Sequence, residues 1–446
     1  MTDLSMVLET TGVLAGAGGL GYAKVRAPRV YWLLVGLPVT WGRFTFTYRS
    51  TMDVCGLTVQ PSRMRAFIAR NVARREVLPV PPKVRRVRAT STGLRVTLRL
   101  PAGLEPADLM AASERLRHAW GVHSVTIAET KPGHVELRMT GYDVLRQVRM
   151  PRRARPEGLA VPVALREDGT AFVRDYRQVP MALTLGANSS GKSVYQRNLI
   201  KGLARLPVAL VGIDCKRGVE HSAYAPRLSA LVTTPDDSAS LLDVLVGEME
   251  SRFDLLSAHG VSDMWDLPER LRPVPVVVLV DEVAELFLIS SKKDEERRER
   301  IVTALIRLAQ MARAVGIYLE VCGQRFGSEL GKGATMLRAQ LTGRVVHRVN
   351  DKQTAEMGLA DVAPDAVAAA SLIPAERPGT AVAADSSGGW AKIRTPHTSR
   401  DEAKASCRAF AHLVPDLPVL DRFRPHVPAD APASGPSLVK PRPVTE

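Results

Sequence analysis

Residues Gly186 to Ser193 have the composition of a loop that holds the phosphates of a nucleotide. They read Gly–Ala–Asn–Ser–Ser–Gly–Lys–Ser, so that four residues separate two glycines and Lys–Ser follows. Glycines let the backbone fold with its N–H groups toward an anion, and a helix starting near Lys192 adds the positive end of its dipole. The pattern predicts that Lys192 neutralises the β- and γ-phosphate oxygens and that Ser193 gives an oxygen to Mg²⁺. The predicted nucleotide-binding residues are Gly186, Ala187, Asn188, Ser189, Ser190, Gly191, Lys192 and Ser193.

Two adjacent acids, Asp281 and Glu282, follow the apolar run VPVVVLV of residues 274–280. A phosphate loop needs a metal-coordinating acid at the end of a neighbouring strand, and Asp281 is predicted to hold Mg²⁺ through water. Glu282 is predicted to polarise the attacking water. The alternative is a pair of acids that only stabilises the start of a helix.

A third polar cluster follows the run GIYLEVC of residues 316–322. Gln324 is predicted to sense the γ-phosphate, and the glycine-rich loop beyond it is a candidate for DNA contact or an ordinary solvated loop. Further on, Arg344 and Arg348 are candidates for arginine fingers that complete a neighbouring subunit's site, with surface salt bridges as the alternative. The candidate DNA-contacting residues are Arg325, Lys332 and Arg338.

Short apolar runs, each followed by a helical pattern, must position these residues. Runs so uniformly apolar are typical of a parallel sheet covered on both faces, which predicts an α/β fold. The predicted strands are residues 181–185, 208–213, 274–280, 316–322 and 343–349, with 379–384 as a possible edge strand.

The first third of the chain carries all of the excess positive charge. The net charge is +15, and residues 1–156 hold 25 Lys and Arg against 10 Asp and Glu, whereas the remainder is balanced. This asymmetry favours a polyanionic partner, either nucleic acid or an anionic membrane surface, over a merely solvated surface. Residues 30–41 are apolar but number only twelve, so they suit a membrane-dipping hairpin or a buried core segment rather than a span.

Shifts in composition predict six segments. A small α+β module, roughly β–α–β–β, is expected before the α/β domain. The segments are a hydrophobic leader and possible membrane anchor (1–50), a basic helix with a Pro-rich linker (51–90), the α+β module with a basic hinge (91–156), the α/β domain (157–395), a helical extension (396–425) and a disordered Pro-rich tail (426–446).

Beyond these patterns, residues 160–390 resemble the motor domain of the FtsK/SpoIIIE DNA translocases. The resemblance rests on the phosphate loop, on EMESRFDLLSAHGV at residues 248–261, on VVVLVDEVAEL, on GQRF and on LTGRVVHRVNDKQTAEMGL. It implies a RecA-like P-loop ATPase core, ATP with Mg²⁺, double-stranded DNA as partner and a homo-oligomer in the form of a hexameric ring. It also implies that Lys192 and Ser193 are Walker A residues, Asp281 and Glu282 Walker B residues and Gln324 the sensor.

The chain also departs from that family's pattern. Asn188–Ser189–Ser190 stands where Thr–Gly–Ser is usual, and Cys215 stands where the family has proline in Asp–Pro–Lys. A C-terminal winged helix is not expected. The small basic module resembles instead the shorter conjugal transfer proteins of actinobacterial plasmids and integrating elements.

The sequence therefore predicts an ATP-driven double-stranded-DNA translocase for plasmid or mobile-element transfer. The expected location is the cytoplasm, with the inner face of the cell membrane as an alternative. Two other functions stay open: a coupling or packaging ATPase that acts on single-stranded DNA, and an ATP-binding switch that controls assembly of a DNA-binding scaffold or regulator. A pure switch does not need a water-activating acid such as Glu282.

Overall fold

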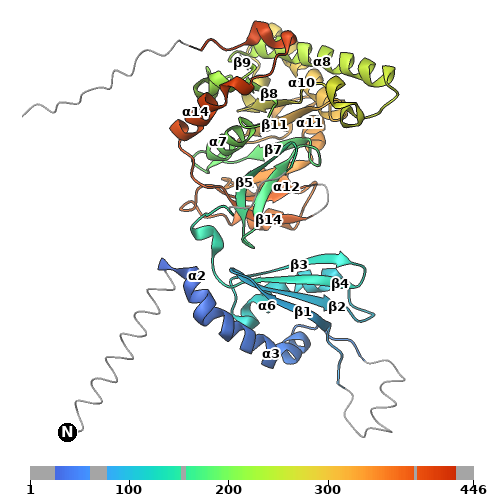
Figure 1. Cartoon of the computed structure of the whole chain (residues 1–446), viewed down its shortest axis with the longest axis vertical. Helices are drawn as coiled ribbons and strands as arrows, with labels where there is room; N and C mark the ends of the chain where they lie inside the picture. Colours follow the sequence, from blue (N-terminus) through green and yellow to red (C-terminus); the bar gives the residue numbers. More distant parts are fainter. Residues whose placement is uncertain (1–25, 61–77, 152–156, 386–388, 428–446) are drawn as a thin grey trace, which may run out of the picture. The chain divides into compact units, whose positions relative to one another are not determined.

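The computed structural model describes residues 26–60, 78–151, 157–385 and 389–427 (Figure 1). These fall into two compact units. The N-terminal unit comprises residues 1–151 and 165–171, and the C-terminal unit comprises residues 152–164 and 172–446.

The N-terminal unit is built on a four-stranded antiparallel sheet with helices on one face. The strands lie in the order β1-β2-β4-β3. Leu94, Val96 and Leu98 alternate along β2 and pack with Leu116 and Trp120 of α6, so the sheet has one apolar face and one open face. In Figure 1, α3 and α6 lie on the same side of the strands. The elements are β1 (Lys83–Ala89), β2 (Gly93–Arg99), β3 (Ser124–Lys131), β4 (His134–Thr140), α3 (Leu37–Val54), α5 (Pro106–Ala111) and α6 (Ser113–Trp120).

The apolar segment at residues 30–41 runs through α2 (Pro28–Tyr31), the π-helical turn η1 (Trp32–Gly36) and the start of α3. Trp32 in η1 is buried. Further along the chain, α3 buries Phe44 and Met52, which belong to the core of the unit. Leu34 and Phe46 are exposed on the same helical stretch. No helix in the described ranges combines the length and apolarity that a membrane crossing requires. Within residues 30–41 themselves, Trp32 is buried, whereas Val30, Leu33, Leu34, Val39 and Trp41 are exposed.

The α+β module is larger than the sequence predicts. Its order is β1-β2-α5-α6-β3-β4, and it includes α3 and β1, which the sequence analysis placed in the leader and the linker. The strand β1 was missed because KVRRVRA alternates arginine with valine, and its solvent-facing half reads as a basic tract. The basic helix predicted before it falls on residues 61–77, which lie outside the described ranges, as does most of the predicted tail.

The C-terminal unit contains a ten-stranded sheet in the order β6-β5-β14-β13-β12-β7-β11-β10-β8-β9. The strands from β12 to β9 run parallel to one another, which confirms the predicted parallel core. The strands are β5 (Ala160–Arg166), β6 (Ala171–Asp175), β7 (Met181–Leu185), β8 (Ala209–Ile213), β9 (Ala230–Val232), β10 (Val276–Val280), β11 (Ile317–Gly323), β12 (Gly343–His347), β13 (Thr380–Ala384) and β14 (Trp390–Arg394).

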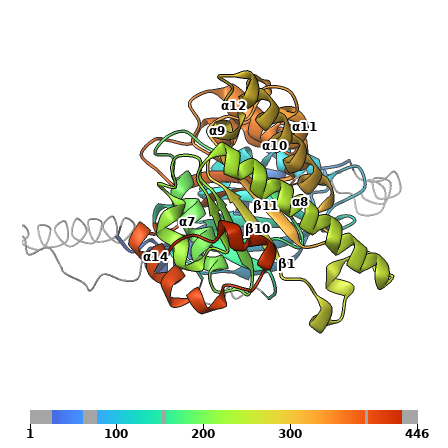
Figure 2. The ribbon, with the colours of Figure 1, turned by 90° about the horizontal axis from the view of Figure 1, so that it is seen from above.

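Helices cover both faces of this sheet, which explains why its central strands are apolar along their whole length. One core joins the sheet to α8, α10 and α11, and a second joins it to α7 and α14. Figure 2 shows α7 and α14 on one side of the strands and α10, α11 and α12 on the other. The helices are α7 (Lys192–Leu203), α8 (Pro235–Ala258), α9 (Val283–Phe287), α10 (Lys292–Met311), α11 (Ala334–Gln340), α12 (Lys352–Leu359), α13 (Ala366–Ser371) and α14 (Arg400–Ala409).

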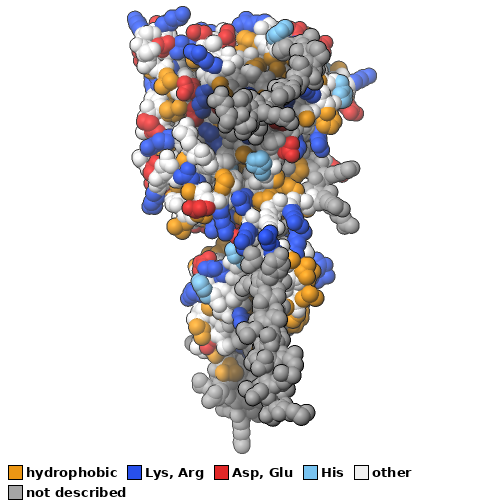
Figure 3. All heavy atoms as spheres, turned by 90° about the vertical axis from the view of Figure 1, so that its left-hand side faces the viewer, with side chains coloured by type: hydrophobic (Ala, Val, Ile, Leu, Met, Phe, Trp, Pro, Cys, Tyr) orange, Lys and Arg blue, Asp and Glu red, His pale blue; other side chains and the backbone are white. Residues whose placement is uncertain are grey.

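The strand at residues 380–384 is not at the edge of the sheet. It is β13, which pairs antiparallel with β12 on one side and with β14 on the other, so the prediction of an edge strand was wrong. The sequence could not show this, because the pairing depends on β14, whose short WAKIR pattern includes Lys392 and Arg394 and was not predicted as a strand. The expected helical extension is present as α14 followed by short 3-10 turns. Figure 3 shows Lys and Arg interspersed with Asp and Glu over this unit, in keeping with its balanced charge.

Candidate active site

The predicted phosphate loop connects β7 to α7, as the pattern requires. Gly191 is the N-cap of α7, and no side chain caps this helix, so N–H groups of its first turn remain open to an anion. Ala187 donates its N–H to the carbonyl of Arg348 (2.9 Å), and Gly379 donates to the carbonyl of Ser190 (2.8 Å). These bonds hold the loop against the ends of neighbouring strands.

Both glycines of the loop lie where a side chain would clash, Gly191 with the backbone of Gly379 and Gly186 with neighbouring side chains. Gly191 has φ of +104°, and a Cβ there would lie 2.3 Å from the backbone nitrogen of Gly379. A Cβ on Gly186 would lie 2.8 Å from Cβ of His347. Ser189 also adopts a left-handed backbone, with φ of +59°, where the related family usually has glycine. Asn188 and Ser189 are exposed at the tip of the loop, whereas Ser190 is buried.

The two predicted acids lie at the carboxyl end of β10. Asp281 and Glu282 are each 5% exposed, and the parallel register places them beside the ends of β8 and β11. Oε2 of Glu282 is 3.2 Å from Nζ of Lys192. The acid pair and the phosphate loop therefore form one site, with the strand β11 between β7 and β10.

A second lysine, which the sequence analysis did not assign to the site, also contacts the acid pair. Nζ of Lys216 lies 3.3 Å from Oε2 of Glu282 and 3.6 Å from Oδ2 of Asp281. Burial lowers the pKa of Lys216, but the two carboxylates outweigh it and the net shift is upward. The ammonium is therefore charged when it neutralises the pair.

The turn that carries Lys216 is held by Asp214, which is fully buried at the end of β8. Its carboxylate accepts the N–H groups of Glu220 and His221, each at 2.9 Å, and of Lys216 at 3.2 Å. Arg217 follows with φ of +58°. The turn thus forms with Cys215 in place of the proline that is usual in related sequences. The Asp–Xaa–Lys pattern was the available signal for Lys216.

Gln324, the predicted sensor, lies directly after β11. Its backbone N–H donates to Oε1 of Glu282 at 3.1 Å. The peptide that carries the Gln324 side chain is thereby tied to the predicted water-activating acid.

The residues present are suited to Mg²⁺ and nucleotide. A serine hydroxyl at the start of α7 and the carboxylate of Asp281 are hard oxygen donors of the kind that Mg²⁺ prefers. The open N–H groups of the loop and the ammonium groups of Lys192 and Lys216 suit the phosphate oxygens. The carboxylate of Glu282 forms an ion pair with the ammonium of Lys192, so a phosphate that binds Lys192 must replace Glu282 as its partner.

The two arginines proposed as fingers lie within their own chain's structure. The guanidinium of Arg348 donates to the carbonyl of Asn188 at 3.0 Å, so it lies beside its own phosphate loop. Arg344 is 1% exposed and donates to the carbonyl of Arg338 at 2.7 Å, and burial lowers its pKa to about 10. Arg344 is therefore enclosed in the fold, whereas Arg348 is partly exposed, and of the two only Arg348 is at the site.

The three candidates for DNA contact differ in exposure. Lys332 is exposed, and within the described residues no ion pair or hydrogen bond engages its side chain. Arg325 is 46% exposed and lies 3.6 Å from Glu329. Arg338 is largely buried and donates to the carbonyl of Phe326 at 3.2 Å. The loop therefore presents Lys332 and Arg325 to solvent, whereas Arg338 supports the fold.

The motif EMESRFDLLSAHGV lies in the last part of α8 and has a structural role. Arg252 is 3% exposed, and it donates to Glu248 at 2.7 Å and to the carbonyl of Val315 at 2.9 Å. These bonds join α8 to the turn that leads into β11, the strand that presents Gln324.

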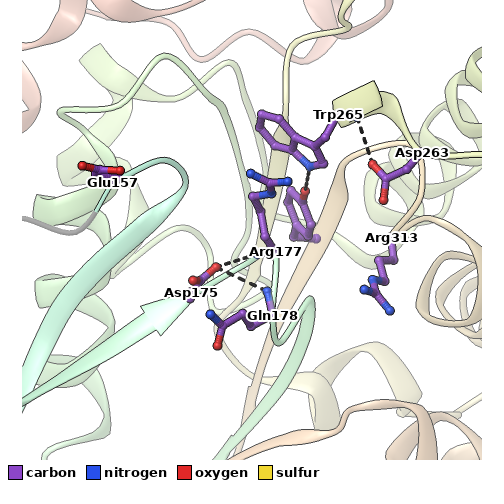
Figure 4. Close-up of a pocket in the computed structure, with 8 residues that line it drawn as sticks. Glu157, Asp175, Arg177, Gln178, Asp263, Trp265 and Arg313 are labelled. Carbon is purple, nitrogen blue, oxygen red and sulfur yellow. Dashed lines mark hydrogen bonds between the residues drawn. The ribbon is translucent and has the colours of Figure 1, made fainter. Parts of the chain in front are cut away.

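A pocket of about 360 Å³ lies elsewhere in the C-terminal unit. Figure 4 shows Trp265 and Arg177 side by side in this pocket. The indole N–H of Trp265 donates a hydrogen bond of 3.2 Å to the hydroxyl of Tyr318. Arg177 stacks on the same indole, with its guanidinium carbon 4.7 Å from the ring centre. Tyr318 stands at the start of β11 and Gln178 precedes β7, so this pocket is at the strand ends opposite the phosphate loop.

Comparisons with known proteins agree with this geometry. A model of the FtsK/SpoIIIE family matches residues 144–270 and 266–328. A model described as the actinomycete conjugal transfer protein N-terminal domain matches residues 17–141. Together they match most of the N-terminal unit and the C-terminal unit as far as residue 328.

Individual relatives are similar over most of their length. Transfer protein TraSA of Streptomyces ambofaciens is 55% identical over 414 residues, which is 90% of this chain and 100% of that protein. A sporulation regulatory protein of Streptomyces azureus is 84% identical over 270 residues, 60% of this chain and 89% of that one. The solved structure of the pCW3 conjugation coupling protein TcpA with ATPγS covers 82% of this chain and 99% of its own, with a TM-score of 0.54. At 18% identity, that likeness shows the fold alone.

Proposed function

From its membership of the FtsK/SpoIIIE family, and from its N-terminal domain of the actinomycete conjugal transfer kind, we propose a function for this chain. It hydrolyses ATP to move double-stranded DNA during plasmid or mobile-element transfer. The fold is that of a P-loop ATPase. To this fold the proposal adds that hydrolysis is coupled to DNA movement and that the reaction uses Mg²⁺. It also adds that the chain forms a hexameric ring and acts in the cytoplasm.

The observation that carries the proposal is the cluster of Lys192, Lys216, Glu282 and Gln324. A protein that only binds nucleotide has no need for a buried carboxylate bonded both to the phosphate-loop lysine and to a sensor peptide. A buried carboxylate is costly unless it is paired, and here two ammonium groups compensate it. The cluster therefore favours a hydrolase over a binding switch.

In the proposed reaction the chain contributes mainly position and charge. The loop N–H groups and Lys192 hold the β- and γ-phosphates, and bound Mg²⁺ would supply Lewis-acid stabilisation of the phosphate charge. Release of Lys192 from Glu282 leaves that carboxylate free to orient water, while Lys216 keeps the acid pair neutralised. Gln324, tied to Glu282 through its N–H, reports the state of the γ-phosphate to the loop carrying Arg325 and Lys332.

The test is the ATPase rate of the full chain with duplex DNA, with single-stranded DNA and without DNA. We expect stimulation by duplex DNA at low salt and at concentrations that permit ring formation, and loss of turnover in Lys192→Ala. Absence of stimulation by duplex DNA would refute the translocase proposal. Stimulation by single-stranded DNA alone would instead support a coupling or packaging ATPase. Electron microscopy of the ATPγS-bound chain on duplex DNA tests the ring.

Membrane association through residues 1–50 stays a prediction. Its first half lies outside the described ranges, and its second half combines buried Trp32 and Phe44 with exposed Leu34 and Phe46. Fractionation of cells that express the chain with and without residues 1–45 decides it. Recovery of both forms with the membranes would rule out this segment as the anchor.

A further inference from the structure

The open face of the N-terminal unit's sheet carries a dense set of basic side chains. Cross-strand register places Lys83 opposite Arg99, Arg86 opposite Thr97, and Arg88 opposite Arg95. On the next strand Arg138 lies opposite Arg95. We call this set the basic face, and it consists of Lys83, Arg86, Arg88, Arg95, Arg99 and Arg138.

Like charges that face each other across antiparallel strands destabilise a sheet. The basic face has three such pairs in succession, Lys83 with Arg99, Arg88 with Arg95, and Arg95 with Arg138. Burial cannot be the reason for these residues, because Lys83, Arg86, Arg88 and Arg99 are exposed. A surface that accepts this repulsion in its unbound form gains stability when a polyanion binds it.

Only one carboxylate stands among these side chains on the four strands. Glu136 lies 3.9 Å from Arg95 and 3.2 Å from Arg138, and Arg138 also lies 3.3 Å from Asp168. For Lys83, Arg86, Arg88 and Arg99, no carboxylate among the described residues lies within ion-pair distance. Four cationic side chains on β1 and β2 are thus free for a ligand, while Glu136 orients Arg95.

The geometry of the face suits a phosphate backbone. Alternate residues on a strand are about 6.6 Å apart and neighbouring strands about 4.8 Å apart, so the cations form a closely spaced array, with one register shift between Val84 and Arg86 on β1. Among the described residues, the exposed large apolar side chains of this unit do not lie on the basic face. Most, such as Leu34 and Phe46, lie on the helical stretch of residues 28–54, and the others are Leu78 and Met110. A lipid surface is bound through inserted apolar groups as well as charge, and the basic face presents arginine and lysine without them.

We propose that the basic face binds the phosphate backbone of duplex DNA without regard to sequence. The choice of duplex DNA rests on the proposed function, whereas the location of the surface rests on the register and exposure of its residues. In this arrangement the N-terminal unit is a second DNA-binding element, separate from the loop of the C-terminal unit that carries Lys332.

The experiment compares two triple variants of the full chain that lose the same charge. The test variant is Arg86→Ala/Arg88→Ala/Arg99→Ala on the basic face. The control variant is Arg43→Ala/Arg49→Ala/Arg115→Ala, whose arginines are exposed on α3 and α6. Binding to a labelled 30-base-pair duplex is measured by fluorescence anisotropy without nucleotide, from 50 to 300 mM salt. Circular dichroism and thermal melting verify that each variant is folded.

Each phosphate contact contributes about 0.9 to the slope of log K against log salt. We therefore expect the slope of the test variant to fall by about 2 to 3, and its Kd at 100 mM salt to rise at least tenfold. The control should change the Kd less than threefold. Arg86→Lys/Arg88→Lys/Arg99→Lys should retain the slope, because contacts to a backbone depend on charge.

Equal effects of the two alanine variants would overturn the proposal. A loss of binding to vesicles of phosphatidylserine and phosphatidylcholine with unchanged DNA binding would also overturn it, and would assign the basic face to lipid. The proposed function fails separately, since it requires duplex DNA to stimulate the wild-type ATPase. If stimulation occurs and the test variant binds DNA like the control, only the basic face is refuted.

Discussion

Replacement of Glu282 by glutamine separates the two roles that its position implies, which are the ion pair with Lys192 and the activation of the attacking water. At 3.2 Å, an ion pair with Lys192 is worth about 5 kcal/mol at an effective dielectric constant of about 20, before the cost of desolvation is subtracted. ATP must displace this pair. Glu282→Gln removes the charge at nearly constant volume, so it should leave ATP binding unchanged or tighten it by up to about tenfold.

Hydrolysis should respond in the opposite direction. Loss of a positioned general base costs about 10²- to 10⁴-fold in rate, and an amide cannot take the proton from the attacking water. The assay pairs steady-state ATPase kinetics with equilibrium binding of a fluorescent ATP analogue. Glu285→Gln is the matched control, because Glu285 is partly exposed on α9, three residues further along, and has no contact with Lys192 among the described residues. We expect the control to retain turnover within about twofold.

Two results would contradict this reasoning. Near-normal turnover of Glu282→Gln would show that another group activates the water. ATP binding weakened more than tenfold would show that the ion pair between Glu282 and Lys192 supports the nucleotide-binding form of the loop rather than competing with it.

Three further predictions concern residues that only the structure brings into contact. Lys216→Ala should lower kcat about tenfold with little change in KM, and Lys216→Arg should restore part of it; an unchanged kcat would exclude a role beside the acid pair. Arg252→Ala should lower the free energy of unfolding in urea by about 2 to 4 kcal/mol, because the Val315 carbonyl and Glu248 lose their partner, whereas the exposed Arg300→Ala should cost less than about 1 kcal/mol. Burial lowers the pKa of His347 to about 4, so between about pH 6.5 and 4 the unfolded chain binds a proton that the folded chain does not. The free energy of unfolding should therefore decrease by about 1.4 kcal/mol for each unit by which the pH falls in this range. His347→Gln should remove that part of the pH dependence in urea titrations.

Local patterns were sufficient to predict the phosphate loop and the strand-terminal acids that the fold brings together, while their roles in catalysis stay predictions. Gly191, Lys192 and Asp281 could be assigned because a phosphate loop and a strand-terminal acid each occupy a few consecutive residues. Five of the predicted strands coincide with observed parallel strands, because burial on both faces makes their residues uniformly apolar. The family resemblance was likewise contained in short motifs and is confirmed by the matched family models.

Contacts between distant residues could not be predicted in the same way. Lys216 reaches Glu282 across 66 positions, and Arg348 reaches Asn188 across 160, and neither contact leaves a periodic signal in the sequence. The strand β13 was placed at an edge because nothing in its own residues shows that β14 covers it.

For the positive charge of the first third of the chain, the sequence determines the amount and the tertiary structure determines the placement. Its excess of lysine and arginine follows from the sequence alone and indicates a polyanionic partner. Which of these side chains share a surface depends on strand pairing, because a shift of one residue would turn Arg86 and Arg88 toward the core. The sequence determined that there is charge to bind a polyanion; the fold decided that three strands, β1, β2 and β4, present it on one open face.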